Sequence, residues 1–292
     1  MEQNKKPKTY IPFRKTACMR IIAGTSSPLL AKRIADELNV PLAKTTFKRF
    51  PDGELYVKVE DVDNEVIVVQ SVTSNDDLVC LMLLFDALES CDITAVVPYM
   101  GYSRQDRKFF DGEAISIRAV ARLIESYANK VISVNLHSRE AASHFRKLEE
   151  VDAMELIGEH YRDEDVVMIS PDFGSLERVK RAAKAAGCEF DYLEKRRIDA
   201  EHVEITPKSL DVEGRRVVIV DDIISTGGTI VEAAKALRAE KVEAACVHAV
   251  LASNALNKLY AAGVARVVAT DTIERAVSEL SVATLIAEKL RS

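Results

Sequence analysis

The sequence predicts an α/β fold made of two doubly wound domains, each built on a parallel sheet, because three observations agree. Short runs of β-branched and other apolar residues alternate along the chain with segments of helical apolar spacing. The order of elements in the second half echoes the first, so that residues 217–237 correspond to 66–88. Polar residues follow several predicted strands directly, where open α/β sheets bind their ligands. We therefore expect an internal structural repeat of one α/β plan.

The length and composition suit two globular units. At 292 residues the chain can form two domains of about 140 residues each. Hydrophobic residues make up 48% of the chain, and no apolar run approaches the roughly 20 residues of a membrane span. No apolar run follows the basic N-terminus, as a signal peptide would require. We expect a loosely ordered extension at 1–18, a first domain at 19–153 and a second domain at 154–292.

The cysteines and the net charge indicate the cellular compartment of the protein and the kinds of partner it can bind. The five cysteines are scattered, odd in number and without a CxxC pair, which fits reduced thiols better than disulfides or a zinc site. The net charge is −6, with lysine and arginine spread among the acids, so no basic face indicates nucleic-acid binding. We expect a soluble cytoplasmic protein that binds neither nucleic acid nor membrane. An anionic substrate must then be held by local cations and metal.

The first half begins with a predicted strand at 21–23 and a helix at 28–38, in whose first turn Pro28 is favoured. Residues 55–59 alternate between apolar and polar, which predicts a half-exposed strand. The other strands of this half read as buried, and the other helices have apolar residues at helical spacing. These strands are predicted at 66–69, 95–98 and 131–134, and the helices at 117–127 and after 71–75 as far as 88.

The second half starts with a predicted strand at 166–169, followed by a polar turn and a helix. Four β-branched residues at 217–220 predict a strand buried on both faces of a parallel sheet, with a helix at 230–237. Residues 198–210 fit neither the strand period nor the helix period. We therefore expect a long polar loop there.

The segment after the strand at 217–220 is the strongest functional motif. Two carboxylates, Asp221 and Asp222, stand where this strand is expected to end. The loop that follows consists of small hydroxyl residues and glycines, namely Ser225, Thr226, Gly227, Gly228 and Thr229. Glycines let backbone N–H groups face a ligand, and the next helix N-terminus favours anions. This order predicts a sugar phosphate site, although a helix cap or solvated turn is the structural alternative. No Gly-Lys-Ser/Thr follows, so the loop is not a Walker A.

Two segments of the first half join aromatic residues to charges. Residues 50–54, FPDGE, are explained in isolation by a Pro-Asp-Gly turn. Residues 99–108, YMGYSRQDRK, follow a predicted strand and bring aromatic rings together with three cations. Guanidinium groups bind phosphate oxygens bidentately, so this segment suits a phosphorylated ligand. The alternative is a solvated charged loop.

Further polar residues stand after strands or before the polar loop. His137 and Asp172 both follow predicted strands and could share a divalent cation or its waters. For His137 alone, a buried hydrogen-bonded histidine is the alternative. Residues 194–197, EKRR, precede the segment 198–210. Their cations could form a lid over phosphate charge or belong to a solvated basic loop.

Six motifs in one order resemble the ribose-phosphate pyrophosphokinase (phosphoribosyl pyrophosphate synthetase) family over nearly all of the chain after residue 18. Phosphoribosyltransferases share only the last motif, so the upstream motifs make the distinction. The motifs are FPDGE (50–54), YSRQDRK (102–108), NLH (135–137), SPDFG (170–174), EKRR (194–197) and VVIVDDIISTGGT (217–229).

The resemblance implies two domains of phosphoribosyltransferase-like type and a transfer of pyrophosphate from ATP to the 1-hydroxyl of ribose 5-phosphate. The products would be phosphoribosyl pyrophosphate and AMP. The carboxylates of Asp221 and Asp222 would bind the ribose hydroxyls, and the loop at 225–229 would bind the 5-phosphate. Lys195 and Arg197 would be the mobile catalytic cations.

The resemblance also implies how ATP and its Mg²⁺ cofactor would be held. His137 and Asp172 would bind the metal or nearby phosphates. The ATP-binding residues would come from two subunits of a homo-oligomer. Phe50, Asp52 and Glu54 would hold the adenine, reaching in from the neighbouring subunit. Arg104 and Gln105 would also bind ATP.

The chain departs from the family pattern at a few positions. Asn135 stands where aspartate is usual, and Ser225 stands where many members carry aspartate. Arg139 and Glu140 replace glutamines, and with the short C-terminus these differences resemble the archaeal branch. Two other functions stay open. One is a phosphoribosyltransferase, in which the cations of 194–197 would lack a purpose. The other is a non-catalytic subunit that senses phosphoribosyl pyrophosphate or associates with a synthetase. Such a subunit would be expected to lose the cations of 194–197.

Overall fold

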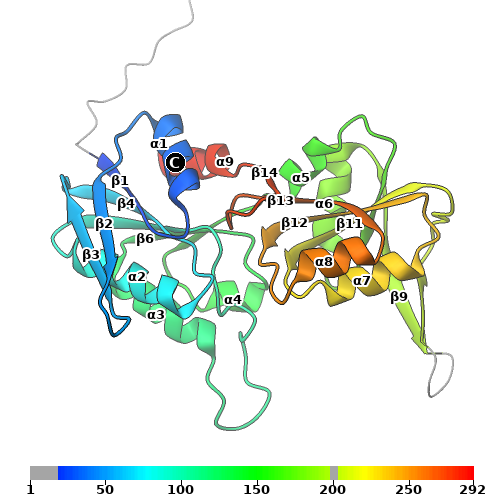
Figure 1. Cartoon of the computed structure of the whole chain (residues 1–292), viewed down its shortest axis with the longest axis horizontal. Helices are drawn as coiled ribbons and strands as arrows, with labels where there is room; N and C mark the ends of the chain where they lie inside the picture. Colours follow the sequence, from blue (N-terminus) through cyan, green and yellow to red (C-terminus); the bar gives the residue numbers. More distant parts are fainter. Residues whose placement is uncertain (1–18, 198–202) are drawn as a thin grey trace, which may run out of the picture.

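The structure is a computed structural model that describes residues 19–197 and 203–292, and the predicted extension at 1–18 lies outside these residues. Its first half is a five-stranded parallel sheet in the order β1-β4-β5-β6-β7, with an antiparallel hairpin of β2 and β3 beside it (Figure 1). The strands are β1 (Met19–Ala23), β2 (Lys44–Arg49), β3 (Leu55–Glu60), β4 (Glu65–Val69), β5 (Asp92–Val97), β6 (Lys130–Val134) and β7 (Leu148–Val151).

The second half is a seven-stranded sheet in the order β10-β9-β8-β11-β12-β13-β14, parallel except for the pair of β9 and β10. Its strands are β8 (Val167–Ser170), β9 (Glu189–Arg197), β10 (Val203–Pro207), β11 (Arg216–Ile224), β12 (Lys241–Ala249), β13 (Val264–Thr270) and β14 (Ser278–Leu280). Along the chain, an antiparallel pair of strands follows β1 before β4 and again follows β8 before β11, so the predicted α/β repeat is confirmed.

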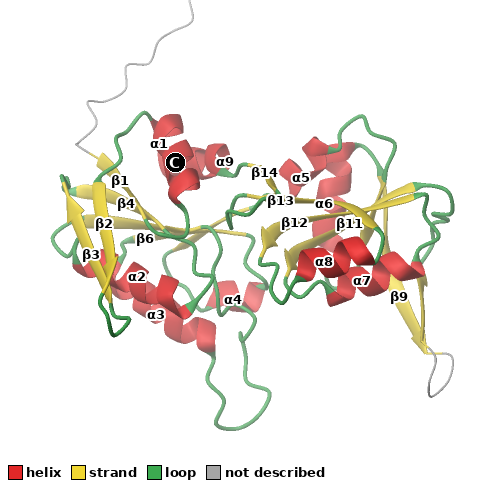
Figure 2. Ribbon diagram, in the orientation of Figure 1, coloured by secondary structure: helices red, strands yellow, loops and turns green. Residues whose placement is uncertain are grey.

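Helices cover both faces of the two sheets (Figure 2). They are α1 (Pro28–Leu38), α2 (Asn75–Asp86), α3 (Ser116–Tyr127), α4 (Arg139–Ser143), α5 (Met154–His160), α6 (Leu176–Ala186), α7 (Gly228–Ala236), α8 (Ala255–Ala261) and α9 (Ala283–Arg291). The helix α1 has the predicted bounds. No helix in the described part of the chain is both long and apolar enough to cross a membrane.

Two predictions about the second half were wrong in detail. The segment expected to be a long polar loop contains β10, which pairs antiparallel with β9 through backbone hydrogen bonds that a side-chain pattern does not reveal. The strand at 217–220 continues through both aspartates to Ile224, because β12 pairs with it along that whole length. The loop after β11 is therefore shorter than expected, and α7 begins at Gly228 rather than at residue 230.

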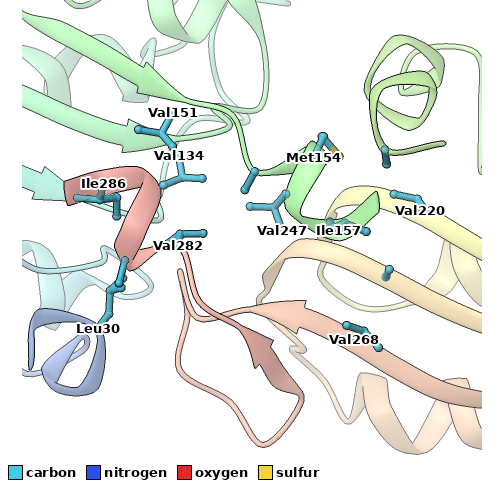
Figure 3. Packing of buried hydrophobic residues seen from close by; sticks show 14 of the residues in the cluster. Leu30, Val134, Val151, Met154, Ile157, Val220, Val247, Val268, Val282 and Ile286 are labelled. Atoms are coloured by element: carbon cyan, nitrogen blue, oxygen red, sulfur yellow. The ribbon is translucent and has the colours of Figure 1, made fainter. Parts of the chain in front are cut away.

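One hydrophobic core joins the two halves (Figure 3). Val134 and Val151 of the first sheet belong to the same buried cluster as Val220 and Val247 of the second. The C-terminal helix α9 returns to the first half, where Ile286 joins this cluster beside α1. The helices α1, α9, α5 and α6 thus line a shared core, while separate clusters underlie α2 and α3 in one half and α7 and α8 in the other. Any site between the halves is held in place by this common packing.

Candidate active site

The acidic pair and the loop after β11 form one wall of a pocket. Parallel pairing with β8 and β12 buries this strand and directs its carboxyl end toward the other half. Gly227 has φ 75, a left-handed conformation that glycine tolerates best, and it precedes the first turn of α7. A pocket of about 280 Å³, here called the loop pocket, lies at this point. It is lined by Arg104, His137, Asp172, Ser175 and residues 221–230.

The two halves of the chain meet in this pocket. Arg104 and His137 come from loops after β5 and β6, whereas the remaining lining residues belong to the second half. A second pocket, of about 700 Å³, adjoins it and shares His137, Asp172 and Ser175. This second pocket is otherwise lined by 135–136, Ser138, Arg139, Glu150, Asp152, Gly174, Glu177, Arg178 and Arg181. Two adjoining hollows of unequal size can hold two different ligands with their reacting groups side by side.

The two carboxylates of the acidic pair have different electrostatic surroundings. Burial would raise the pKa of Asp222, but the His137 hydrogen bond and the Arg178 charge outweigh it and lower that pKa. The His137 Nδ1 and Arg178 Nη1 atoms lie 3.0 and 3.3 Å from Asp222 Oδ2. Burial and the neighbouring Asp222 charge instead raise the pKa of Asp221, against hydrogen bonds from the Asp222 N–H and the Ser175 hydroxyl. Asp222 is therefore the stable anion, and Asp221 is the carboxyl that more readily holds a proton.

Ser175 and Arg178 were not predicted as site residues. Ser175 ends the segment that joins β8 to α6, which also holds the predicted Asp172, and Arg178 lies in the first turn of α6. The Ser175 hydroxyl donates to Asp221 Oδ1 at 3.0 Å, and its N–H donates to Asp172 Oδ1 at 3.0 Å. The cation at 178 has no sequence motif of its own, because its partner Asp222 lies far away along the chain. A polar residue one turn into a helix that follows a site strand is the available signal.

The structure brings Arg104 to the loop pocket but does not bring Gln105 to either pocket. The Gln105 side-chain amide donates instead to the carbonyl of Arg107 at 3.0 Å. Asp106 anchors this loop, because its carboxylate accepts a 2.5 Å hydrogen bond from the Ser138 hydroxyl. That hydroxyl also caps α4 by accepting from the Ala141 N–H. The loop is thereby fixed next to His137.

The hairpin residues Phe50, Asp52 and Glu54 do not line either pocket of the same chain. They form the turn between β2 and β3, in which the Phe50 N–H donates to the Glu54 carbonyl at 2.8 Å. The Phe50 ring is 51% exposed and meets the Tyr56 ring edge-on at 6.2 Å. The turn chemistry predicted from the sequence is present, and the aromatic ring stays open to solvent.

Lys195 and Arg197 lie near the end of β9, opposite Ile205 and Val203 of β10. This end of β9 extends away from the body of the second sheet (Figure 1). The side chains of Lys195 and Arg197 lie outside the described part of the structure.

His137 and Asp172 line both pockets, but within residues 19–197 and 203–292 no three His, Cys, Asp or Glu side chains are placed to hold a metal. This donor set does not fit an all-protein cage. It does fit Mg²⁺, which keeps several waters and takes one or two protein ligands together with substrate phosphates.

Asn135 has a structural role at the edge of the second pocket. Its Nδ2 donates to Asp152 Oδ1 at 2.8 Å, and its Oδ1 accepts from the Ala153 N–H at 2.7 Å. A carboxylate at this position could not donate to Asp152. The amide therefore connects the end of β6 to the start of the second half.

Comparisons with known proteins agree with this architecture. Residues 19–128 match the family model of the N-terminal domain of ribose phosphate pyrophosphokinase, and residues 144–282 match that of the phosphoribosyl transferase domain. Ribose-phosphate pyrophosphokinase 2 of Archaeoglobus fulgidus is 59% identical over 275 residues, which cover 93% of this chain and 100% of the relative. Ribose-phosphate pyrophosphokinase of Methanosarcina acetivorans is 45% identical, with 94% and 99% covered.

A solved structure gives the same result in three dimensions. Phosphoribosylpyrophosphate synthetase from Mycobacterium smegmatis superimposes with a TM-score of 0.79 at 32% sequence identity. The similarity covers 94% of this chain and 97% of the other.

Proposed function

The chain belongs to the ribose-phosphate pyrophosphokinase family, and from that premise we propose how its own residues carry out the reaction. The enzyme transfers pyrophosphate from ATP to the 1-hydroxyl of ribose 5-phosphate, giving phosphoribosyl pyrophosphate and AMP for nucleotide biosynthesis. The observation that carries the residue-level proposal is the loop pocket, where Arg104 and His137 of the first half face the acidic pair and loop of the second.

The loop pocket takes ribose 5-phosphate. Backbone N–H groups at 225–229 and the N-terminus of α7 receive the 5-phosphate, supported by the hydroxyls of Ser225, Thr226 and Thr229 with Gly227 and Gly228. Asp221 and Asp222 accept hydrogen bonds from the ribose hydroxyls. The raised pKa of Asp221 suits a carboxyl beside a substrate hydroxyl, because it can exchange a proton there.

The second pocket takes the triphosphate of ATP. Arg104 binds ATP from the adjoining loop pocket, with Gln105 next to it on the same loop. Arg139 and Arg181, which line the second pocket, neutralise phosphate charge. Phe50, Asp52 and Glu54 hold the adenine of the ATP that is bound by a neighbouring subunit. The active enzyme is therefore a homo-oligomer with its ATP site near the interface. The exposed Phe50 ring at a hairpin tip supports this assignment.

The family assignment is consistent with a divalent metal cofactor, and we assign Mg²⁺ to His137 and Asp172. When bound, the ion neutralises and orients the phosphates of ATP. Lys195 and Arg197 on β9 supply positive charge to the transferred group. The described cysteines are all free thiols, which supports a cytoplasmic location.

The test is AMP release by the 292-residue chain in the presence of ATP, Mg²⁺ and ribose 5-phosphate. AMP is expected to form only when ribose 5-phosphate is present. The Lys195→Ala variant is expected to lose about 10²- to 10³-fold in kcat, as for removal of one charge-stabilising donor. Lys32→Ala, which removes an exposed cation on α1, serves as the control at full rate.

Two results would contradict the proposal. Absence of ribose-dependent AMP, with or without binding of phosphoribosyl pyrophosphate, would favour a sensing subunit or a phosphoribosyltransferase. Full activity of Lys195→Ala would leave the reaction in place but remove the role given to β9.

A further inference from the structure

We propose that Arg178 is a positioning residue that ties the ATP side of the site to the ribose side. It does so by binding Asp222 and the backbone of His137 at the same time. This inference rests on the proposed function, because the roles of His137 and Asp222 define the two sides. It adds a residue that touches neither substrate in this account and acts through these two partners.

The contacts form a closed triangle between three elements. Arg178, in the first turn of α6, places Nη1 3.3 Å from Asp222 Oδ2, and its Nη2 donates to the backbone carbonyl of His137. His137 Nδ1 closes the triangle at 3.0 Å from the same Asp222 oxygen. The Asp222 side chain is 4% exposed and that of Arg178 is 20% exposed, so water competes little for these contacts.

The chemistry of arginine suits this bridge. A guanidinium group is planar and presents several N–H donors in fixed directions, so it can serve a carboxylate and a carbonyl together. A lysine has a point charge on a flexible stem and would satisfy one partner well. The positive charge is also required, because a buried carboxylate that loses its cation is strongly destabilised.

The bridge lies where the two substrates must be aligned. His137 follows β6 in the first half, whereas Asp222 and Arg178 belong to the second. Because two donors hold Asp222 Oδ2, the carboxylate plane is fixed relative to both β11 and the segment after β6. In-line transfer depends on the relative position of the reacting groups, and small displacements lower the rate greatly. Arg178 therefore sets the geometry in which the ribose hydroxyl meets ATP.

The experiment compares Arg178→Met, Arg178→Lys and the control Lys184→Met, which changes an exposed cation at the other end of α6. For each, ribose-dependent AMP release is measured at saturating ATP and ribose 5-phosphate, and each KM is determined. Thermal unfolding is followed in parallel. Arg178→Met is expected to lose about 10- to 100-fold in kcat, the range for a charged hydrogen bond. Both KM values are expected to change less than kcat. Arg178→Lys should fall between the wild type and Arg178→Met, and Lys184→Met should match the wild type.

The outcomes separate this inference from the function on which it rests. An inactive wild type would overturn the proposed function itself. An active wild type with a kcat within twofold in Arg178→Met would overturn the positioning role. If Arg178→Met does not fold, Arg178→Lys decides, because it keeps the cation. Full activity of a folded Arg178→Lys would show that charge alone suffices and would overturn the bridge.

Discussion

His248 is a buried histidine whose surroundings keep it neutral. Its ring lies 5.0 Å from the Tyr99 ring, and its Nε2 lies 3.1 Å from the carbonyls of Val134 and Asn135. Carbonyls only accept, so Nε2 carries the proton of the neutral ring. Its Nδ1 lies 2.9 Å from the Thr272 hydroxyl. Burial lowers the pKa of His248 to about 4.

This shift predicts a stability that depends on pH. Below an unfolded-state pKa of about 6.5, the unfolded chain takes up a proton that the folded chain refuses down to about pH 4. The free energy of unfolding should therefore decrease as the pH is lowered from about 6.5 to about 4, by on the order of 3 kcal/mol from His248 alone. In His248→Gln this contribution is absent, so the stability gap between variant and wild type should narrow from pH 7 to pH 4 in urea unfolding. A gap that stays constant would contradict this account.

Single residues also show the limit of reading a site from its sequence. Asp221, Asp222 and the loop that follows them were predicted because strand, acids and glycines are consecutive. Arg178 was not, because its contact with Asp222 exists only once α6 and β11 pack together. Asn135 was noticed as a departure from a pattern, but its bond to Asp152 requires the fold.

At the scale of an element, Gly227 is the critical position between β11 and α7. Alanine at φ 75 is strained by about 1–2 kcal/mol, and a Cβ there would lie 3.4 Å from Leu259 Cγ. Gly227→Ala is therefore expected to lose about that much stability and also to raise the KM for ribose 5-phosphate at least tenfold. Steady-state kinetics and urea unfolding measure the two effects.

Gly187 offers a matched control at the end of α6. It has the same φ of 75, and an added Cβ would meet nothing within 4 Å. Gly187→Ala should show a similar loss of stability with unchanged kinetics. Equal kinetic losses in both glycine variants would show that general strain, and not the loop itself, governs substrate affinity.

Elements with strong apolar runs were predictable, and those defined by pairing were not. The strands β1, β4, β5, β6 and β8 and the helices α1 and α3 appear where side-chain periodicity indicates them. The strand β10 was missed because it is a short strand at the edge of the sheet, where backbone pairing with β9 defines it. The extension of β11 through the acids likewise depends on β12.

At the scale of the whole molecule, the chain returns to its first half at the end. The carboxylate of Glu274 accepts the N–H groups of Leu29 and Leu30, both at 2.8 Å, and so caps α1. Asp271 pairs with Arg33 of the same helix. The helix α9 then packs on α1 and adds Ile286 to the shared core. The division near residue 153 stays a prediction, and the last helix lies against the first half.

The shared core predicts that a change in α9 weakens the whole protein. Ile286 is fully buried, so Ile286→Ala should lower the free energy of unfolding by about 2–5 kcal/mol through the cavity it leaves. Leu29→Ala removes a similar side chain that is 59% exposed on α1 and should cost less than about 1 kcal/mol. Chemical denaturation of both variants provides the comparison. Equal losses would contradict a core that includes α9.

The central claim is that the two adjoining pockets align ATP with the 1-hydroxyl of ribose 5-phosphate for transfer of a pyrophosphoryl group. ³¹P NMR of the reaction mixture tests it directly, because it distinguishes the products. The account predicts equal growth of AMP and of a diphosphate attached to the ribose anomeric carbon, with the 5-phosphate retained. Formation of ADP together with a ribose 5-phosphate that carries one phosphate on its anomeric carbon would contradict it. Release of free pyrophosphate with no anomeric diphosphate would contradict it as well.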